Sequence, residues 1–187
     1  MSDDPAASPP PQDGRICHQC GSRPDAPEQN ACPEDGSWFI PQEVHDRHGS
    51  DPFLGRVIAD KYPIVGVLGE GGMGSVYKAV QQPVGREVAV KVIRYTGDDA
   101  ETVRTRFTHE ASIVSQLNHP NTVTLFDFGF HTDGTLYMVL ELVKGHPLTD
   151  EVKMGAMEVE RGCSIVAAAL DALIEAHQHG LVHRDLK

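Results

Sequence analysis

Apolar and polar residues alternate along five segments in the middle of the chain, which is the pattern of strands with one buried face. The run from Glu87 to Lys91 shows the alternation most clearly. These segments are rich in β-branched and aromatic residues, and turn residues such as Asp133-Gly134 separate two of them. We therefore predict an antiparallel sheet with strands at residues 62–68, 75–80, 87–91, 123–130 and 136–143.

A helical period replaces the alternation in three other segments. The first begins near Asp98, an acid suited to the positive start of a helix, and ends before Pro120. A short helix is predicted over 148–152 and a long one over 160–179, closed by Gly180. Strands and helices together predict an α+β fold. The apolar face of the first helix is formed by Val103, Phe107, Ala111, Val114 and Leu117.

The first 55 residues show neither period and are the more acidic part of the chain, with ten acidic and three basic side chains. Residues 1–14 are rich in proline, small residues and acids, so we predict that they are disordered. Residues 41–55 are predicted to be a linker, which places the start of the main domain at residue 56.

Three cysteines in residues 15–40 have the spacing of metal-binding knuckles. Cys17 and Cys20 form one C-x-x-C pair, and Cys32 opens a second knuckle in which Asp35 stands where a fourth cysteine is usual. The segment resembles a short zinc ribbon, and such a ribbon would serve as a module for binding a protein partner. The alternatives are His18 or His45 as the fourth ligand, or three free cysteines with no metal. Cys163 lies in an apolar helical pattern and is predicted to be a core residue.

The composition limits the classes of function. The net charge of −11 argues against a nucleic-acid binder. No run reaches the roughly 18 apolar residues of a membrane-spanning helix. Asp3 and Asp4 stand where a signal peptide would carry Lys or Arg, so we expect a cytoplasmic protein.

A G-x-G-x-x-G set at Gly69, Gly71 and Gly74 connects the first two predicted strands. Glycines at this spacing let backbone N–H groups approach a polyphosphate closely. A dinucleotide-binding turn would need a helix after the third glycine, but a strand follows. A phosphate loop ending in G-K-S/T is absent, because Ser75 and Val76 follow Gly74. The glycines therefore cap a β-hairpin.

This hairpin, followed by a strand that ends in Lys91, resembles the nucleotide-binding lobe of the bacterial eukaryotic-like Ser/Thr protein kinases. The resemblance implies that Val76 and Ala89 enclose the adenine of ATP and that Lys91 binds its α- and β-phosphates. It also implies that Glu110, on the helix that the family calls αC, pairs with Lys91. The residues that the resemblance assigns to the loop over ATP are Leu68, Gly69, Glu70, Gly71, Gly72, Met73, Gly74, Ser75 and Val76.

The strand over 136–143 resembles the kinase hinge, in which the backbone of Glu141 and Val143 would bind adenine and Leu140 would be the gatekeeper. Near the end of the chain, residues 183–187 spell H-R-D-L-K, the catalytic-loop motif of Ser/Thr kinases. By this resemblance Asp185 accepts or orients the proton of the substrate hydroxyl, and Lys187 neutralises the transferred phosphoryl group.

The sequence Asp127-Phe128-Gly129 spells the D-F-G of kinases, but it precedes the catalytic-loop motif and lies in a predicted strand, so we assign it no catalytic role. The family's magnesium ligands, an asparagine after Lys187 and a later D-F-G, do not occur in these 187 residues. We therefore predict a truncated kinase domain over 56–187, with an N-lobe at 56–143 and the first C-lobe helices at 144–187. Such a fragment would not transfer phosphate to protein substrates by itself. The alternative is a non-catalytic remnant whose zinc ribbon binds a partner.

Overall fold

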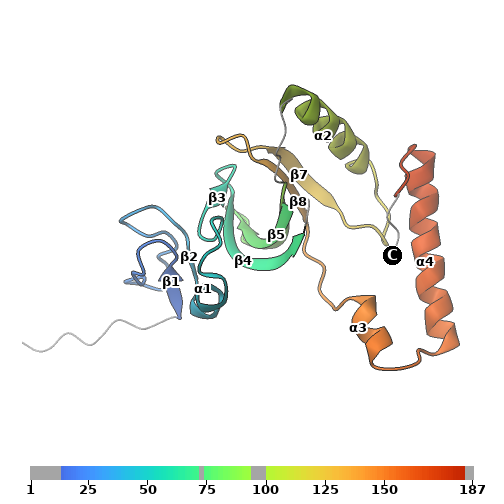
Figure 1. Ribbon diagram of the computed structural model, residues 1–187, viewed down its shortest axis with the longest axis horizontal. Coiled ribbons are helices and arrows are strands. Elements are labelled where there is room, and N and C mark those ends of the chain that lie inside the picture. The colour runs from blue at the N-terminus through green and yellow to red at the C-terminus, as the bar shows by residue number, and fades with distance from the viewer. Residues whose placement is uncertain (1–13, 72–73, 94–99, 184–187) are drawn as a thin grey trace, which may run out of the picture.

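The computed structural model describes residues 14–71, 74–93 and 100–183, and its central element is a six-stranded antiparallel sheet in the order β3-β4-β5-β6-β8-β7 (Figure 1). All five predicted strands are confirmed, and a two-residue strand precedes them. Their bounds are β3 Val57–Ile58, β4 Tyr62–Gly71, β5 Gly74–Gln81, β6 Arg86–Ile93, β7 Leu125–Phe130 and β8 Leu136–Glu141.

The two faces of the sheet have different surroundings, which follows from the alternation of residues along each strand. One face is fully buried and includes Tyr77, Val90 and Val139. On the opposite face Val76, Lys91 and Met138 lie side by side across β5, β6 and β8, and each is only partly buried. The first face forms the core of the protein, and the second is the face on which the resemblance places ATP.

Helix α2, Ala100–Val114, lies against the edge of the sheet formed by β7. The ring of Phe107 contacts Phe128 and Phe130 edge-on, with centroid distances of 6.2 and 5.8 Å. Phe107 and Ala111, two residues of the predicted apolar face, are buried. The predicted helix is therefore confirmed over Ala100–Val114, and its aromatic contacts place it beside the outermost strand. Its predicted start at Asp98 lies outside the described residues, and the helix ends before Leu117.

The N-terminal module, residues 14–55, packs on the buried face of the sheet (Figure 1). It contains the paired strands β1, Arg15–Cys17, and β2, Phe39–Pro41, followed by helix α1, Gln42–His48. The expectation of a linker over 41–55 is therefore wrong for the described structure: this segment holds α1 and the fully buried Leu54. The physical reason is that the apolar face of the sheet needs a cover, and Leu54 and its neighbours supply it.

Two further helices, α3 Leu148–Lys153 and α4 Val159–Gln178, follow the sheet as predicted. The prediction that Cys163 is a core residue is wrong, because it lies on an exposed side of α4. Helix α4 and the N-terminal module lie at opposite ends of the molecule (Figure 1). The Asn118 N–H donates to Glu175 at 2.9 Å, and the Asn121 side chain donates to the Ala168 carbonyl at 3.1 Å, so the loop after α2 holds α4. None of the helices in the described part of the chain is long and apolar enough to cross a lipid bilayer.

Candidate functional site

The glycine hairpin is built from β4 and β5, with Gly69 opposite Val76 and Gly71 opposite Gly74. Gly74 has a φ of 143°, and a Cβ there would collide with the carbonyl oxygen of Val92, so the position requires glycine. For Gly69, no heavy atom of the described residues lies within 4 Å of the place a Cβ would take. The hairpin is thus open to an approaching ligand at Gly69, whereas Gly74 is closely packed on β6. Gly72 and Met73 lie outside the described residues.

The predicted adenine site lies along the partly exposed face of the sheet. Ala89 on β6 is paired with Leu140 on β8, and Val76 is paired with Lys91. Ala89 is buried at this face, which leaves a small apolar floor beside the lysine. The register therefore brings four of the predicted residues together on one face, next to the hairpin.

The predicted hinge follows β8 directly. The Glu141 N–H donates to the Thr124 carbonyl at 2.9 Å, and Glu141 itself is exposed. Val143 is 62% exposed and Leu68 is 48% exposed, so both apolar side chains border the sheet face without being covered by protein. Exposed apolar residues beside this apolar floor are what an adenine ring would contact.

Lys91 and Glu110 are not brought together. Within the described residues they form no ion pair, since Lys91 is partly buried on β6 and Glu110 is exposed on α2. Phe107 anchors α2 at β7, and β8 lies between β7 and β6. The pairing of these two side chains stays a prediction.

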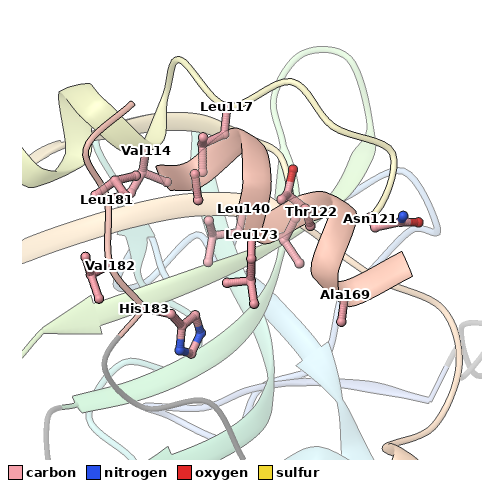
Figure 2. Close-up of a pocket in the computed structure, with 13 residues that line it drawn as sticks. Val114, Leu117, Asn121, Thr122, Leu140, Ala169, Leu173, Leu181, Val182 and His183 are labelled. Atoms are coloured by element: carbon pink, nitrogen blue, oxygen red, sulfur yellow. The ribbon is translucent and has the colours of Figure 1, made fainter. Parts of the chain in front are cut away.

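A cavity of about 560 Å³ lies behind the predicted hinge, between α4 and the segment from Val114 to Val123. Figure 2 shows Leu140 from β8, Leu173 from α4 and His183 among the side chains that line it. The cavity therefore joins the gatekeeper position to the first residue of the H-R-D-L-K motif. Asp185 and Lys187 themselves lie outside the described residues.

The early D-F-G sequence has a structural role. In β7 one carboxylate oxygen of Asp127 accepts a hydrogen bond from the Tyr62 hydroxyl at 2.8 Å, and the other accepts from the Phe128 N–H at 2.8 Å. Burial, with the Asp127 hydrogen bond, raises the pKa of Tyr62 well above its usual range. Asp127 therefore joins β7, at one edge of the curved sheet, to the start of β4, the strand next to the other edge.

Four side chains of the N-terminal module converge as predicted for the metal site. One ligand atom each from Cys17, Cys20, Cys32 and Asp35 lies within 4.8 Å of the other three. The Cys17 sulfur is 3.2 Å from an Asp35 oxygen, and the Cys20 and Cys32 sulfurs are 3.6 Å apart. Three sulfurs and one carboxylate oxygen in such a group form a donor set that zinc accepts.

The two histidines named as alternative ligands lie outside this group. The rings of His18 and His45 contact each other edge-on at 5.6 Å instead. The structure thus favours Asp35 as the fourth member of the group.

Sequence analysis missed Ser22. Its hydroxyl lies 3.1 Å from the Cys20 sulfur and 3.3 Å from the Cys32 sulfur. The Ser22 hydrogen bond lowers the pKa of Cys32, whereas burial raises the pKa of Cys17 to about 12. A hydroxyl two residues after a C-x-x-C knuckle was the available signal, but this spacing alone does not indicate which sulfur it contacts.

Comparisons with known proteins agree with the lobe described above. Residues 62–187 match the family model of the protein kinase domain. The chain is 40% identical over 139 residues to the serine/threonine-protein kinase pkn3 of Myxococcus xanthus, which covers 74% of this chain and 25% of that protein. It is 38% identical over 136 residues to the serine/threonine-protein kinase PrkC of Bacillus subtilis, covering 72% and 21%.

Among solved structures, the kinase domain of Mycobacterium tuberculosis PknI is similar, with a TM-score of 0.61 and 30% identity. That comparison covers 71% of this chain and 53% of the PknI chain. The chain therefore spans about a quarter of the length of these two curated relatives and about half of the solved kinase domain. With residues 62–187 matching the family model, the chain belongs to the protein kinase family.

Proposed function

We propose that residues 56–187 supply the ATP-binding part of a serine/threonine protein kinase, which transfers the γ-phosphate of ATP to protein hydroxyl groups. The observation that carries this proposal is the row of Val76, Ala89 and Lys91 beside an open glycine hairpin. The hairpin N–H groups and the lysine would hold the phosphates, and the apolar floor would hold the adenine. The names of the relatives support the choice of Ser/Thr hydroxyls as acceptors.

The family resemblance assigns the remaining roles. Asp185 would orient the substrate hydroxyl and accept its proton, and Lys187 would offset charge on the transferred group. Glu110 would pair with Lys91 after a shift of α2 toward β6. Kinases use magnesium to bridge the phosphates. Asp127 does not fit that ion, because its carboxylate is already held by Tyr62 and Phe128, so we assign no step to magnesium.

Binding of a fluorescent ATP analogue tests the first half of this proposal. Replacing Lys91 by methionine keeps most of the side-chain length but removes the charge, and we expect at least about tenfold weaker binding. The matched control is Lys153→Met: Lys153 is an exposed lysine on α3, away from the sheet, and its ammonium group pairs with Asp150 at 3.3 Å. Equal affinities of the two variants would contradict the assignment of Lys91.

Phosphate transfer tests the second half. Asp185→Asn should leave binding of the ATP analogue unchanged and abolish any transfer to Ser or Thr that the protein catalyses. Transfer that persists in this variant would rule out Asp185 as the catalytic base. Cytoplasm is the compartment that fits this proposal, since both ATP and reduced thiols are found there.

We also propose that the N-terminal module binds one zinc ion through Cys17, Cys20, Cys32 and Asp35, because these four side chains converge. Elemental analysis should find one zinc per chain, lost in Cys17→Ser and kept in Cys163→Ser, whose cysteine is exposed on α4. Asp35→Cys should tighten binding, since thiolates are the stronger zinc ligands. Metal-free protein with three readily alkylated thiols in this module would contradict the proposal. We include in this proposal that the N-terminal module binds a protein partner.

A further inference from the structure

The two-stranded sheet β1–β2 has one face toward the four metal-ligating side chains and one toward the kinase lobe. Ile16 and Ile40 are opposite each other, and both belong to the same buried core as Tyr77 and Val90. The next pair, Cys17 and Phe39, is buried in a separate cluster with Cys32. A strand alternates its side chains between two faces, so each strand contacts both the ligand group and the kinase core.

A second connection runs through the segment after α1. The Trp38 N–H donates to the Gly55 carbonyl at 2.7 Å, and the Gly55 N–H donates to the Ile64 carbonyl on β4 at 3.0 Å. Gly55 thus joins the end of the second knuckle to the strand that leads into the glycine hairpin.

The same segment also contacts the other strand of the hairpin. The Tyr77 hydroxyl donates to the buried carboxylate of Asp51 at 3.1 Å, and the Phe53 ring lies 5.5 Å from the Tyr77 ring. Tyr77 follows Val76 on β5, directly after the glycine loop. Both strands of the hairpin are therefore supported by the N-terminal module.

Short knuckles of this kind have little core of their own, and in structural zinc sites metal binding supplies the free energy that orders them. Loss of order at Cys17 would release Ile16 and, through its pairing partner, Ile40 from the core of the lobe. We propose that metal binding at the group of Cys17, Cys20, Cys32 and Asp35 stabilises strand β5 and thereby controls the nucleotide site. This inference rests on the proposed zinc site, and it makes the metal a regulator of the kinase lobe.

Hydrogen exchange measured by residue tests the coupling without requiring catalysis. The protein is compared after zinc loading, after removal of zinc by a chelator, and after zinc is added back. We expect the amides of β5 to exchange at least about tenfold faster in the zinc-free protein and to recover on restoration. The amides of α4 serve as an internal control, because this helix lies at the opposite end of the molecule (Figure 1) and should not respond.

Two variants separate the metal from other effects of losing a thiol. Cys17→Ser should show fast exchange in β5 with or without zinc, whereas Cys163→Ser should behave as the unaltered protein. Stoichiometric zinc with unchanged exchange in β5 would overturn the coupling and leave the zinc site standing. Absence of bound zinc would overturn both.

Discussion

Asp51 is a buried carboxylate outside the nucleotide site, so it is expected to act through its hydrogen bonds. It accepts from the Tyr77 hydroxyl and, at 2.8 Å, from the Phe53 N–H. In Asp51→Ala both donors lose this acceptor, and losing a hydrogen bond of this kind costs about 0.5–1.5 kcal/mol. We predict that the free energy of unfolding, measured by urea denaturation, falls by about 1–3 kcal/mol.

Asp171 offers the matched control for this substitution, because it is an exposed aspartate on α4. Asp171→Ala should change the free energy of unfolding by less than about 0.5 kcal/mol. Asp51→Asn keeps one oxygen acceptor and should fall between the two. Similar losses for both alanine variants would mean that Asp51 is not the connection between module and lobe that its contacts indicate.

Tyr62 makes stability depend on pH in the alkaline range. Its pKa in the folded protein is raised by burial and by the Asp127 hydrogen bond, whereas the unfolded chain ionises near pH 10. A raised folded pKa means that the contribution is complete below about pH 10 and is lost as the pH rises above it. We predict that urea midpoints decline above about pH 10 and that Tyr62→Phe declines less steeply.

Comparing the unaltered protein with Tyr62→Phe separates the effect of Tyr62 from that of other groups that ionise at alkaline pH. Burial also raises the pKa of Tyr137, so some decline should remain in Tyr62→Phe. Parallel curves for both proteins would show that the phenol is not protected from ionisation in the fold.

At the scale of elements, two glycines of the hairpin have different roles. Gly74 is needed for folding, and Gly69 leaves space for the ligand. A methyl group on Gly74 would collide with the Val92 carbonyl of β6, and the φ of 143° is itself unfavourable for alanine. A methyl group on Gly69 meets open space among the described residues. We predict that Gly74→Ala lowers the free energy of unfolding by more than about 2 kcal/mol, while Gly69→Ala leaves it within about 1 kcal/mol.

Nucleotide binding gives the complementary measurement for this pair. Gly69→Ala should still weaken binding of an ATP analogue by about three- to tenfold, because its Cβ would stand where phosphate approaches the backbone. If the Gly69→Ala protein has normal stability and normal affinity for the ATP analogue, the phosphates do not bind on this side of the hairpin.

The regular elements of the kinase lobe could be predicted because their signals are local. Period-two alternation identified β4, β5, β6, β7 and β8, and the helical period identified α2, α3 and α4. Helix α1 could not be recognised, since Gln42–His48 contains one apolar residue, Val44, and each of its residues is exposed or partly exposed. Its contact with the lobe depends on neighbours that are distant in sequence.

The candidate sites also contain features that local sequence signals predict and features that depend on tertiary packing. The cysteine spacing and the strand register are local, and the structure brings the ligand group and the Val76–Lys91 pair together. The meeting of Lys91 with Glu110 depends on where α2 packs, and this position is set by the contact of Phe107 with β7. Helical spacing predicted the face of Glu110 but not the strand that this face would contact.

At the scale of the whole molecule, α4 carries apolar residues on more than one side. Leu173 and Ala169 line the cavity next to Leu140 (Figure 2). Val166, Leu170 and Ile174, spaced four residues apart, form a second stripe in which each side chain is more than half exposed. A contiguous exposed apolar stripe promotes association in water, so we expect the chain as given to be poorly soluble and to self-associate.

Placing a charge in this stripe should therefore reduce association without unfolding the protein. We predict that Leu170→Lys shifts the protein from larger species toward monomer in sedimentation velocity at equal concentration, because a desolvated ammonium group opposes burial of the stripe. Val84→Lys is the control: Val84 is 73% exposed in the turn between β5 and β6, where it is an isolated apolar residue. If both variants sediment like the unaltered protein, the stripe on α4 does not cause association, and the apolar surface that does so lies elsewhere on the lobe.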